Sequence, residues 1–235
     1  MKQVALEGRK EGRKEGRKIL LFAAFSFAIL FFISPDSYIR GIYGHLDSAW
    51  FFEAGRAWML GLTPYVDFAD SKGPLLWLIY GMGYLISHQD YTGVFWMSVV
   101  FYTAAFYFNY RAALVLTKNS HQSIVASLLM ALFYFFPLFH YEIRAEDFCQ
   151  PFMSISFWAL CVISQGSSNT RQLKQALLAL GGATAALLLI KFNYAAMQLS
   201  IVLCAAITTL RQRRDFAKSF VHYLSGVLIV LLPFV

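Results

Sequence analysis

The chain has 235 residues, of which 58% are hydrophobic and only 14% charged, and its mean hydropathy is +0.54. These values exceed those of an ordinary soluble domain and indicate a polytopic membrane protein. The net charge of +7 raises the question of nucleic-acid binding, but the basic residues stand at the ends of apolar runs, which is the pattern of membrane-topology determinants. Nucleic acid is therefore excluded as a partner.

Residues 7–18 are three copies of Glu-Gly-Arg-Lys, directly before the first apolar run. Because such a repeat can bury nothing, residues 1–18 are expected to form a disordered basic tail on the cytoplasmic side, attracted to anionic headgroups. A secretory signal peptide would also place basic residues before an apolar run, but no small-residue cleavage pattern follows Ser34 and Pro35. We therefore expect the run to be retained as the first membrane helix.

The rest of the sequence is a series of apolar runs, which predicts an all-α polytopic transmembrane bundle in residues 19–235. A transmembrane helix needs about 20 apolar residues, and seven runs approach that length. The expected spans are residues 19–34, 93–116, 123–139, 148–164, 176–190, 192–210 and 220–235.

Residues 75–87 form a further apolar run, but 13 residues is short for a span. If this run does not cross, 15 of the 20 Lys and Arg residues share one side of the membrane, as the positive-inside rule requires of the cytoplasmic side. If it crossed, three basic connections would move to the opposite side. We therefore expect a long first exoplasmic loop at residues 35–92 that carries interfacial helices, and a second exoplasmic loop at residues 140–147.

Within the first loop, the residue spacing over 47–60 predicts a helix that lies along the membrane surface. Asp47 begins this helix and is either its N-cap or a functional acid. His45 stands two residues earlier and is a candidate for orienting Asp47 or for binding substrate or metal. A function for Asp47 therefore depends on the charged groups that the fold brings near it.

A turn separates the two helices expected in the first loop. Asp67 and Asp70 flank it, and aspartate is common at turns because it hydrogen-bonds the backbone. Lys72 is more distinctive, because Gly73 and Pro74 present it at the start of the next helix. A cation near the positive end of a helix could hold a lipid phosphate.

The second exoplasmic loop ends in two adjacent acids, Glu146 and Asp147, and contains Arg144, which could pair with either of them. Carboxylates from two loops can bind a divalent cation such as Mg or Mn, or one of them can act as a general base. Alternatively, both acids cap the helix that follows. Lys191 stands alone in a short exoplasmic turn, where a lysine that snorkels to the interface is the alternative to a functional residue.

The order of these motifs resembles the N-terminal half of bacterial GT-C glycosyltransferases, in particular the protein O-mannosyltransferase-like group that includes the lipid A aminoarabinose transferase. The residues that carry the resemblance are Asp47 before a surface helix, Gly61-x-x-Pro64-Tyr65-x-Asp67, Asp70-x-Lys72-Gly73-Pro74-Leu75 and Ala145-Glu146-Asp147-Phe148-x-x-Pro151-Phe152. The resemblance covers residues 19–235.

The resemblance implies a polyprenyl-phosphate-linked sugar donor and an essential acid in the first exoplasmic loop. Asp47 would take the part of that acid, as a base or a metal-associated carboxylate, and Glu146, with Asp147 adjacent, would match the acid of the second loop. Lys72 would contact the donor phosphate, and Lys191 resembles a further lysine between later helices. The full set of candidate substrate-binding residues is Lys72, His45, Tyr65, Asp70, Arg144 and Lys191, and the candidate ligands for a divalent metal are Asp47 and Glu146.

These observations predict a multi-pass enzyme of the bacterial inner membrane, with a cytoplasmic N-terminus and exoplasmic active loops. It would transfer a sugar from polyprenyl phosphate to a periplasmic glycan, lipid or protein acceptor. A transporter or flippase of lipid-linked saccharides is the alternative, although it predicts charges in the middle of helices and repeat symmetry between halves. The chain ends inside an apolar run, so we expect a C-terminally truncated enzyme, or else a non-catalytic fragment.

Overall fold

The computed structural model describes residues 2–34, 36–39, 46–135, 145–166 and 169–234. In these residues it is an all-α protein, with one isolated bridge between Pro64 and Phe68 as the sole β pairing. Six of the described segments are long and apolar enough to cross a membrane: Gly12–Ile33, Thr92–Thr117, Ala145–Ser164, Thr170–Ile190, Phe192–Arg211 and Phe216–Phe234. The predicted all-α polytopic bundle is confirmed.

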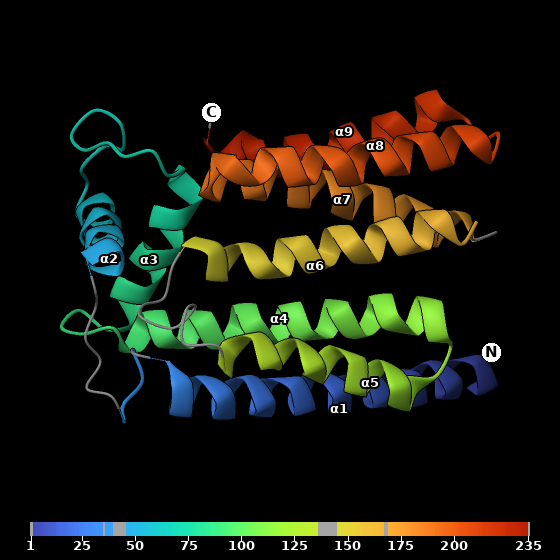
Figure 1. Ribbon diagram of the computed structural model, residues 1–235, viewed down its shortest axis with the longest axis horizontal. Helices are drawn as coiled ribbons and strands as arrows, with labels where there is room; N and C mark the ends of the chain where they lie inside the picture. The colour runs from blue at the N-terminus through green and yellow to red at the C-terminus, as the bar shows by residue number, and fades with distance from the viewer. Residues whose placement is uncertain (1, 35, 40–45, 136–144, 167–168, 235) are drawn as a thin grey trace.

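Successive helices of the bundle run in opposite directions, and two short helices lie across one of its ends (Figure 1). The long helices are α1 (Lys2–Ile33), α4 (Thr92–Thr117), α6 (Ala145–Ser164), α7 (Thr170–Ile190), α8 (Ala195–Arg211) and α9 (Phe216–Leu231), with the 3₁₀ turns η3 (Phe192–Tyr194) before α8 and η4 (Leu232–Phe234) after α9. Helices α4 and α6 are parallel, because the shorter α5 (Ser120–Leu129) returns the chain between them, and so are α7 and α9, which α8 separates in the chain. The crosswise helices are α2 (Leu46–Met59) and α3 (Pro74–Ile86). We call the end that carries α2 and α3 the loop-one end, and the opposite end, where the chain begins, the N-terminal end.

Helix α3 is the run of residues 75–87 whose length is short for a span. Its 13 residues extend about 20 Å, well below the roughly 30 Å of a bilayer's hydrocarbon core. Pro74 occupies the first helical position, where its missing N–H costs nothing. The helices expected in the first loop are therefore present, and neither is part of the bundle.

The run at residues 123–139 differs from the long span that the sequence predicts. The structure has α5 (Ser120–Leu129), capped by the Asn119 side chain, continued by the 3₁₀ turn η1 (Met130–Phe135). Residues 136–139 lie outside the described part of the chain. The described segment runs back along α4 toward the loop-one end (Figure 1).

The basic repeat also differs from the expected disordered tail, because α1 is helical from Lys2 onward. Lys, Arg and Glu favour helix, and the apolar part of α1 supplies a helix from which the repeat can propagate. Side chains from α4 secure this segment: Tyr107 donates to Glu15 Oε2 at 3.1 Å, and Lys18 contacts both Glu15 and the Tyr110 hydroxyl. The last turn of the repeat is therefore helical and packed against α4.

The best-buried part of the bundle is formed by α6 and α7, about half of whose membrane segments is inside the protein. Helix α9 crosses α7 at very close range because two glycines face each other's helix: a Cβ on Gly181 would lie 1.9 Å from the Tyr223 carbonyl oxygen, and one on Gly226 would lie 2.0 Å from that of Leu178. Small residues allow such close helix packing in membranes. Helices α8 and α9 remain mostly exposed to the surroundings of the chain.

Candidate active site at the loop-one end

The turn that carries Lys72 is docked onto the end of α7. The Gly73 amide donates to the Ile190 carbonyl at 3.0 Å, and a Cβ on Gly73 would lie only 2.0 Å from the Leu189 carbonyl oxygen. Any side chain at position 73 would therefore push the turn away from α7. Lys72 directly precedes Gly73, and Lys191 directly follows Ile190. This hydrogen bond therefore brings the backbones of the two lysines close together.

Lys191 joins α7 to the start of α6. Its amide donates to Leu187 at 2.9 Å, its backbone is extended, and its ammonium group pairs with the Glu146 carboxylate. The Lys191 side chain is 21% exposed and that of Glu146 41%, so the pair is sheltered on one side and open on the other. The Lys191 ammonium is therefore partly accessible to an anionic ligand.

Asp147 has a different partner from its neighbour. Tyr102, on α4 and only 3% exposed, donates its hydroxyl to Asp147 Oδ1. The two adjacent acids of the second loop are thus held by different helices, Glu146 by the end of α7 and Asp147 by α4. The sequence offers no signal for Tyr102, because it is one of many aromatic residues in an apolar run.

A buried cluster of aromatic side chains packs next to these charged residues. Tyr80 of α3 contacts Phe51 of α2 and Phe148 of α6, with ring centroids 5.6 and 5.5 Å apart. All three belong to one buried cluster that also includes Leu187 and Ile190 of α7. Because close-packed interiors resist distortion, this cluster holds α2, α3, α6 and α7 in a fixed arrangement around the charged groups.

Lys72 lies against helix α2. The Lys72 ammonium lies 4.0 Å from an Asp70 oxygen and 5.6 Å from the centre of the Phe51 ring. Asp47 is exposed in the first turn of α2, four residues before Phe51. Residues four apart share a helix face, so Asp47 and Phe51 lie on the same face of α2.

The turn before Lys72 is shaped by Tyr65 and Asp67. Tyr65 has a left-handed backbone (φ 64°), and its hydroxyl donates to the Lys72 carbonyl at 3.0 Å. Burial raises the pKa of Tyr65, and the Asp70 carboxylate raises it further. Asp67 accepts the Thr63 amide at 2.7 Å. Asp67 therefore serves the turn, as the sequence indicates, whereas Tyr65 supports the backbone of Lys72 directly.

Two candidate residues, His45 and Arg144, lie outside the described residues. Among those that are described, no three His, Cys, Asp or Glu side chains lie close enough together to hold a metal ion. The predicted binding of Mg or Mn by Asp47 and Glu146 therefore stays a prediction. The structure pairs Glu146 with the Lys191 ammonium.

Residues 71–235 match the family of dolichyl-phosphate-mannose-protein mannosyltransferases. The chain belongs to this family. It is thus a multi-pass membrane glycosyltransferase of the GT-C type. The matched region contains Lys72, Glu146, Asp147 and Lys191, whereas Asp47 precedes it. Comparison with curated proteins and with solved structures gives no significant match.

Proposed function

We propose that this glycosyltransferase moves a sugar from a polyprenyl-phosphate donor to a hydroxyl of a periplasmic glycan, lipid or protein, in the inner membrane of a bacterium. The observation that carries the proposal is the docking of the Lys72 turn beside Lys191 and Glu146. It supplies two cations and a carboxylate at one end of a membrane bundle. A lipid-linked phosphate at a membrane surface requires such a site.

In this proposal, Lys72 and Lys191 bind the donor phosphate. Lys191 exchanges its Glu146 partner for a phosphate oxygen when the donor arrives, and Glu146 positions the lysine in its absence. Lys72 already lies against the Phe51 ring at 5.6 Å and is 20% exposed, so little side-chain freedom remains to be lost on binding. Both lysines stabilise the negative charge that grows on the leaving phosphate.

The reaction breaks the bond between the sugar's anomeric carbon and the phosphate oxygen, and forms a bond between that carbon and the acceptor oxygen. The acceptor hydroxyl gives its proton to the Asp47 carboxylate, and polyprenyl phosphate leaves with the bonding electrons. Asp47 suits this function because it is exposed in the first turn of α2, on the same helix face as Phe51, against which Lys72 lies. General bases of this kind typically contribute about 10²–10⁴-fold to the rate.

The distribution of charge supports an exoplasmic loop-one end. Connections at the opposite end, together with the basic repeat, carry 15 of the 20 Lys and Arg residues. The positive-inside rule assigns that end to the cytoplasm. Lipid-linked sugars would then be used on the outer face of the membrane.

Asp47→Asn in the full chain tests the mechanism, with Glu53→Gln as the matched control. Glu53 is an exposed acid on the same helix, paired with Arg56 at 3.4 Å. Release of polyprenyl phosphate from a panel of radiolabelled polyprenyl-phosphate sugars is measured in proteoliposomes. We expect Asp47→Asn to lower turnover by about 100-fold or more, and Glu53→Gln to leave it unchanged. Normal turnover by well-folded Asp47→Asn protein would rule out the proposed base.

Metal dependence is tested on the same preparation. Dialysis against EDTA followed by addition of Mg or Mn separates two versions of the site. If Asp47 and Glu146 bind a divalent ion, turnover falls on dialysis and returns with the metal. If Lys72 and Lys191 supply the positive charge by themselves, turnover does not change.

A further inference from the structure

We propose a second phosphate site, at the N-terminal end of the bundle, that binds the headgroup of an anionic phospholipid. A cavity of about 370 Å³ opens there between the ends of α4, α6 and α7. The polar residues that line it are Arg111, Lys118, Gln165 and Gln172. They offer two cations and two amides, and no carboxylate is among the described residues that line the cavity. This site is independent of the proposed reaction, which concerns the opposite end.

Arg111 is held in place from behind. Its Nη1 donates to the Tyr107 hydroxyl at 2.9 Å, and its guanidinium carbon lies 5.6 Å from the centre of the Trp158 ring. Arginine has five N–H donors, so donors remain for a ligand, and its planar fork matches two phosphate oxygens. Glu15, which Lys18 and Tyr107 engage on the α1 side of α4, also interacts electrostatically with Arg111.

Lys118 reaches the cavity from the point where α4 ends. Its backbone is left-handed (φ 55°), and its amide donates to the Leu114 carbonyl at 3.0 Å, closing the helix. This geometry turns the chain toward α5 and leaves the Lys118 side chain exposed. The Gln165 and Gln172 amides, from the end of α6 and the start of α7, add N–H donors on the other side.

The cavity lies at the depth of lipid headgroups. Helix α4 has 26 residues and is about 39 Å long, whereas the hydrocarbon core of a bilayer is about 30 Å thick. If α4 enters the core near Thr92, the last two turns, from Arg111 onward, reach the headgroup layer. A phosphate group at this level belongs to a lipid of the surrounding leaflet.

The wall of the cavity favours a lipid over a soluble phosphate. Three aliphatic side chains, Leu114, Val115 and Val162, line it together with the polar groups. They offer an apolar surface for the glycerol and the first methylenes of the acyl chains, which a free phosphate lacks. Basic pockets between membrane helices on the cytoplasmic side bind anionic headgroups in this way.

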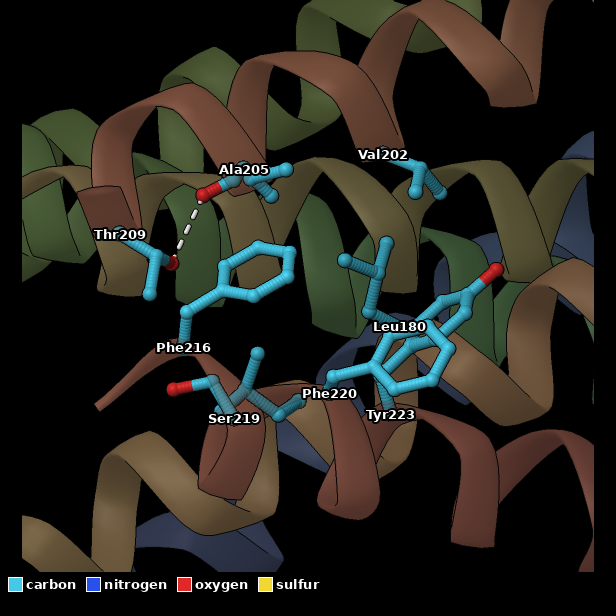
Figure 2. Close-up of a pocket in the computed structure, with 10 residues that line it drawn as sticks. Leu180, Val202, Ala205, Thr209, Phe216, Ser219, Phe220 and Tyr223 are labelled. Carbon is cyan, nitrogen blue, oxygen red and sulfur yellow. Dashed lines mark hydrogen bonds between the residues drawn. The ribbon is translucent and has the colours of Figure 1, made fainter. Parts of the chain in front are cut away.

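A second cavity shows what a site for hydrocarbon alone looks like (Figure 2). It has a volume of about 240 Å³, lies between α7, α8 and α9, and contains no charged side chain. Two of its three hydroxyls donate to backbone carbonyls one turn earlier: Thr209 to that of Ala205 at 2.8 Å, and Ser219 to that of Asp215 at 3.0 Å. It therefore presents no charged group to a phosphate, in contrast to the cavity beside Arg111.

Native mass spectrometry of the full chain in detergent tests the proposal. Short-chain phosphatidylglycerol is titrated, with phosphatidylcholine as the neutral lipid and glycerol 3-phosphate as the soluble phosphate. The test variant is Arg111→Gln with Lys118→Gln, and the control is Arg171→Gln with Lys174→Gln, two exposed cations of α7 that do not line the cavity. We expect phosphatidylglycerol affinity to fall about twentyfold in the test variant and to change less than about twofold in the control.

Three results would overturn the proposal: equal phosphatidylglycerol binding by the test variant, an equal loss in the control pair, and glycerol 3-phosphate binding as tight as the lipid. Arg111 also contacts Tyr107, so the double variant removes a structural contact as well as a cation of the cavity. Lys118→Gln alone avoids this, since Lys118 is exposed, and should weaken phosphatidylglycerol about fivefold. Unchanged affinity in well-folded Lys118→Gln protein would also count against the site.

Discussion

The two ends of the bundle use the same chemical groups in different arrangements. At the loop-one end, Lys191 pairs with Glu146, and Tyr102 donates to Asp147; both contacts join residues 45 positions apart. At the N-terminal end, Lys18 pairs with Glu15, three residues away on the same helix, and tyrosines of α4 contact both. At the loop-one end the ion pair itself joins two helices, whereas at the N-terminal end the ion pair lies within α1 and the two tyrosines of α4 secure that helix to the bundle.

This difference separates a group that can act on a ligand from one that supports the fold. A lysine and a carboxylate from different helices can part while their helices stay in place, which leaves Lys191 available for an anion. The Glu15 and Lys18 pair lies within α1 itself and is held by two tyrosines of α4, so its loss should be felt in stability alone.

The sharpest contrast comes from adding a methyl group at each end. In Gly73→Ala, the new Cβ would meet the Leu189 carbonyl at 2.0 Å and displace the Lys72 turn from Lys191. Moving a catalytic group by about 1 Å typically lowers the rate about 100-fold. Gly12→Ala at the other end meets nothing within 4 Å and should leave turnover unchanged, with stability equal or higher. Equal turnover in both variants would show that the docked turn is not part of the site.

The two ends also offer matched tyrosines on α4, both at most 3% exposed. Tyr102→Phe removes the donor to Asp147, and Tyr110→Phe removes the hydroxyl that Lys18 contacts. Each change should lower the unfolding free energy by about 1 kcal/mol, measured as a shift of the thermal midpoint in detergent. Turnover should fall about tenfold only in Tyr102→Phe, which corresponds to about 1.4 kcal/mol in the barrier. A similar fall in Tyr110→Phe would contradict the separation of the two ends.

The acid-rich loop-one end predicts a pH effect at Tyr91, which precedes α4. Burial raises the pKa of Tyr91 from its ordinary value of 10 to about 12, and the Asp36 and Glu53 carboxylates contribute. Because the pKa is higher in the folded state, the neutral phenol stabilises the fold below pH 10, and this contribution is lost as the pH rises through 12. Between pH 9 and 12, the midpoint temperature of thermal unfolding should therefore fall less steeply in Tyr91→Phe than in the parent. Parallel curves of midpoint temperature against pH would show that ionisation of Tyr91 does not cause the loss of stability.

The smallest expected effect compares two local ion pairs of the same spacing. Glu53 and Arg56, at the loop-one end, lie 3.4 Å apart with about half of each side chain exposed, whereas Glu15 and Lys18 lie 2.8 Å apart and are better covered. Double-mutant cycles with Gln and Met replacements should give about 0.3 kcal/mol for the first pair and up to about 1 kcal/mol for the second. The reverse order would mean that contact with α4 does not strengthen the pair of α1.

Much of the fold follows from local sequence patterns. Runs of apolar residues determine the membrane helices, the limited length of residues 75–87 keeps α3 out of the bundle, and Asp67 caps the turn that its position suggests. These features depend on composition over a few turns of chain, which is why they can be predicted. The short length of α5, which ends at Leu129, and the helical basic repeat differ from expectation, because each depends on contacts with other helices.

The candidate site shows the same division. The sequence by itself determined which residues were available: the acids Asp47, Glu146 and Asp147 and the lysines Lys72 and Lys191. Only the tertiary structure decided that Glu146 faces Lys191, that Asp147 faces Tyr102, and that a glycine at position 73 lets its turn reach α7. Partners 45 residues apart meet because side-chain packing sets how α4, α6 and α7 cross, and no local pattern encodes that geometry.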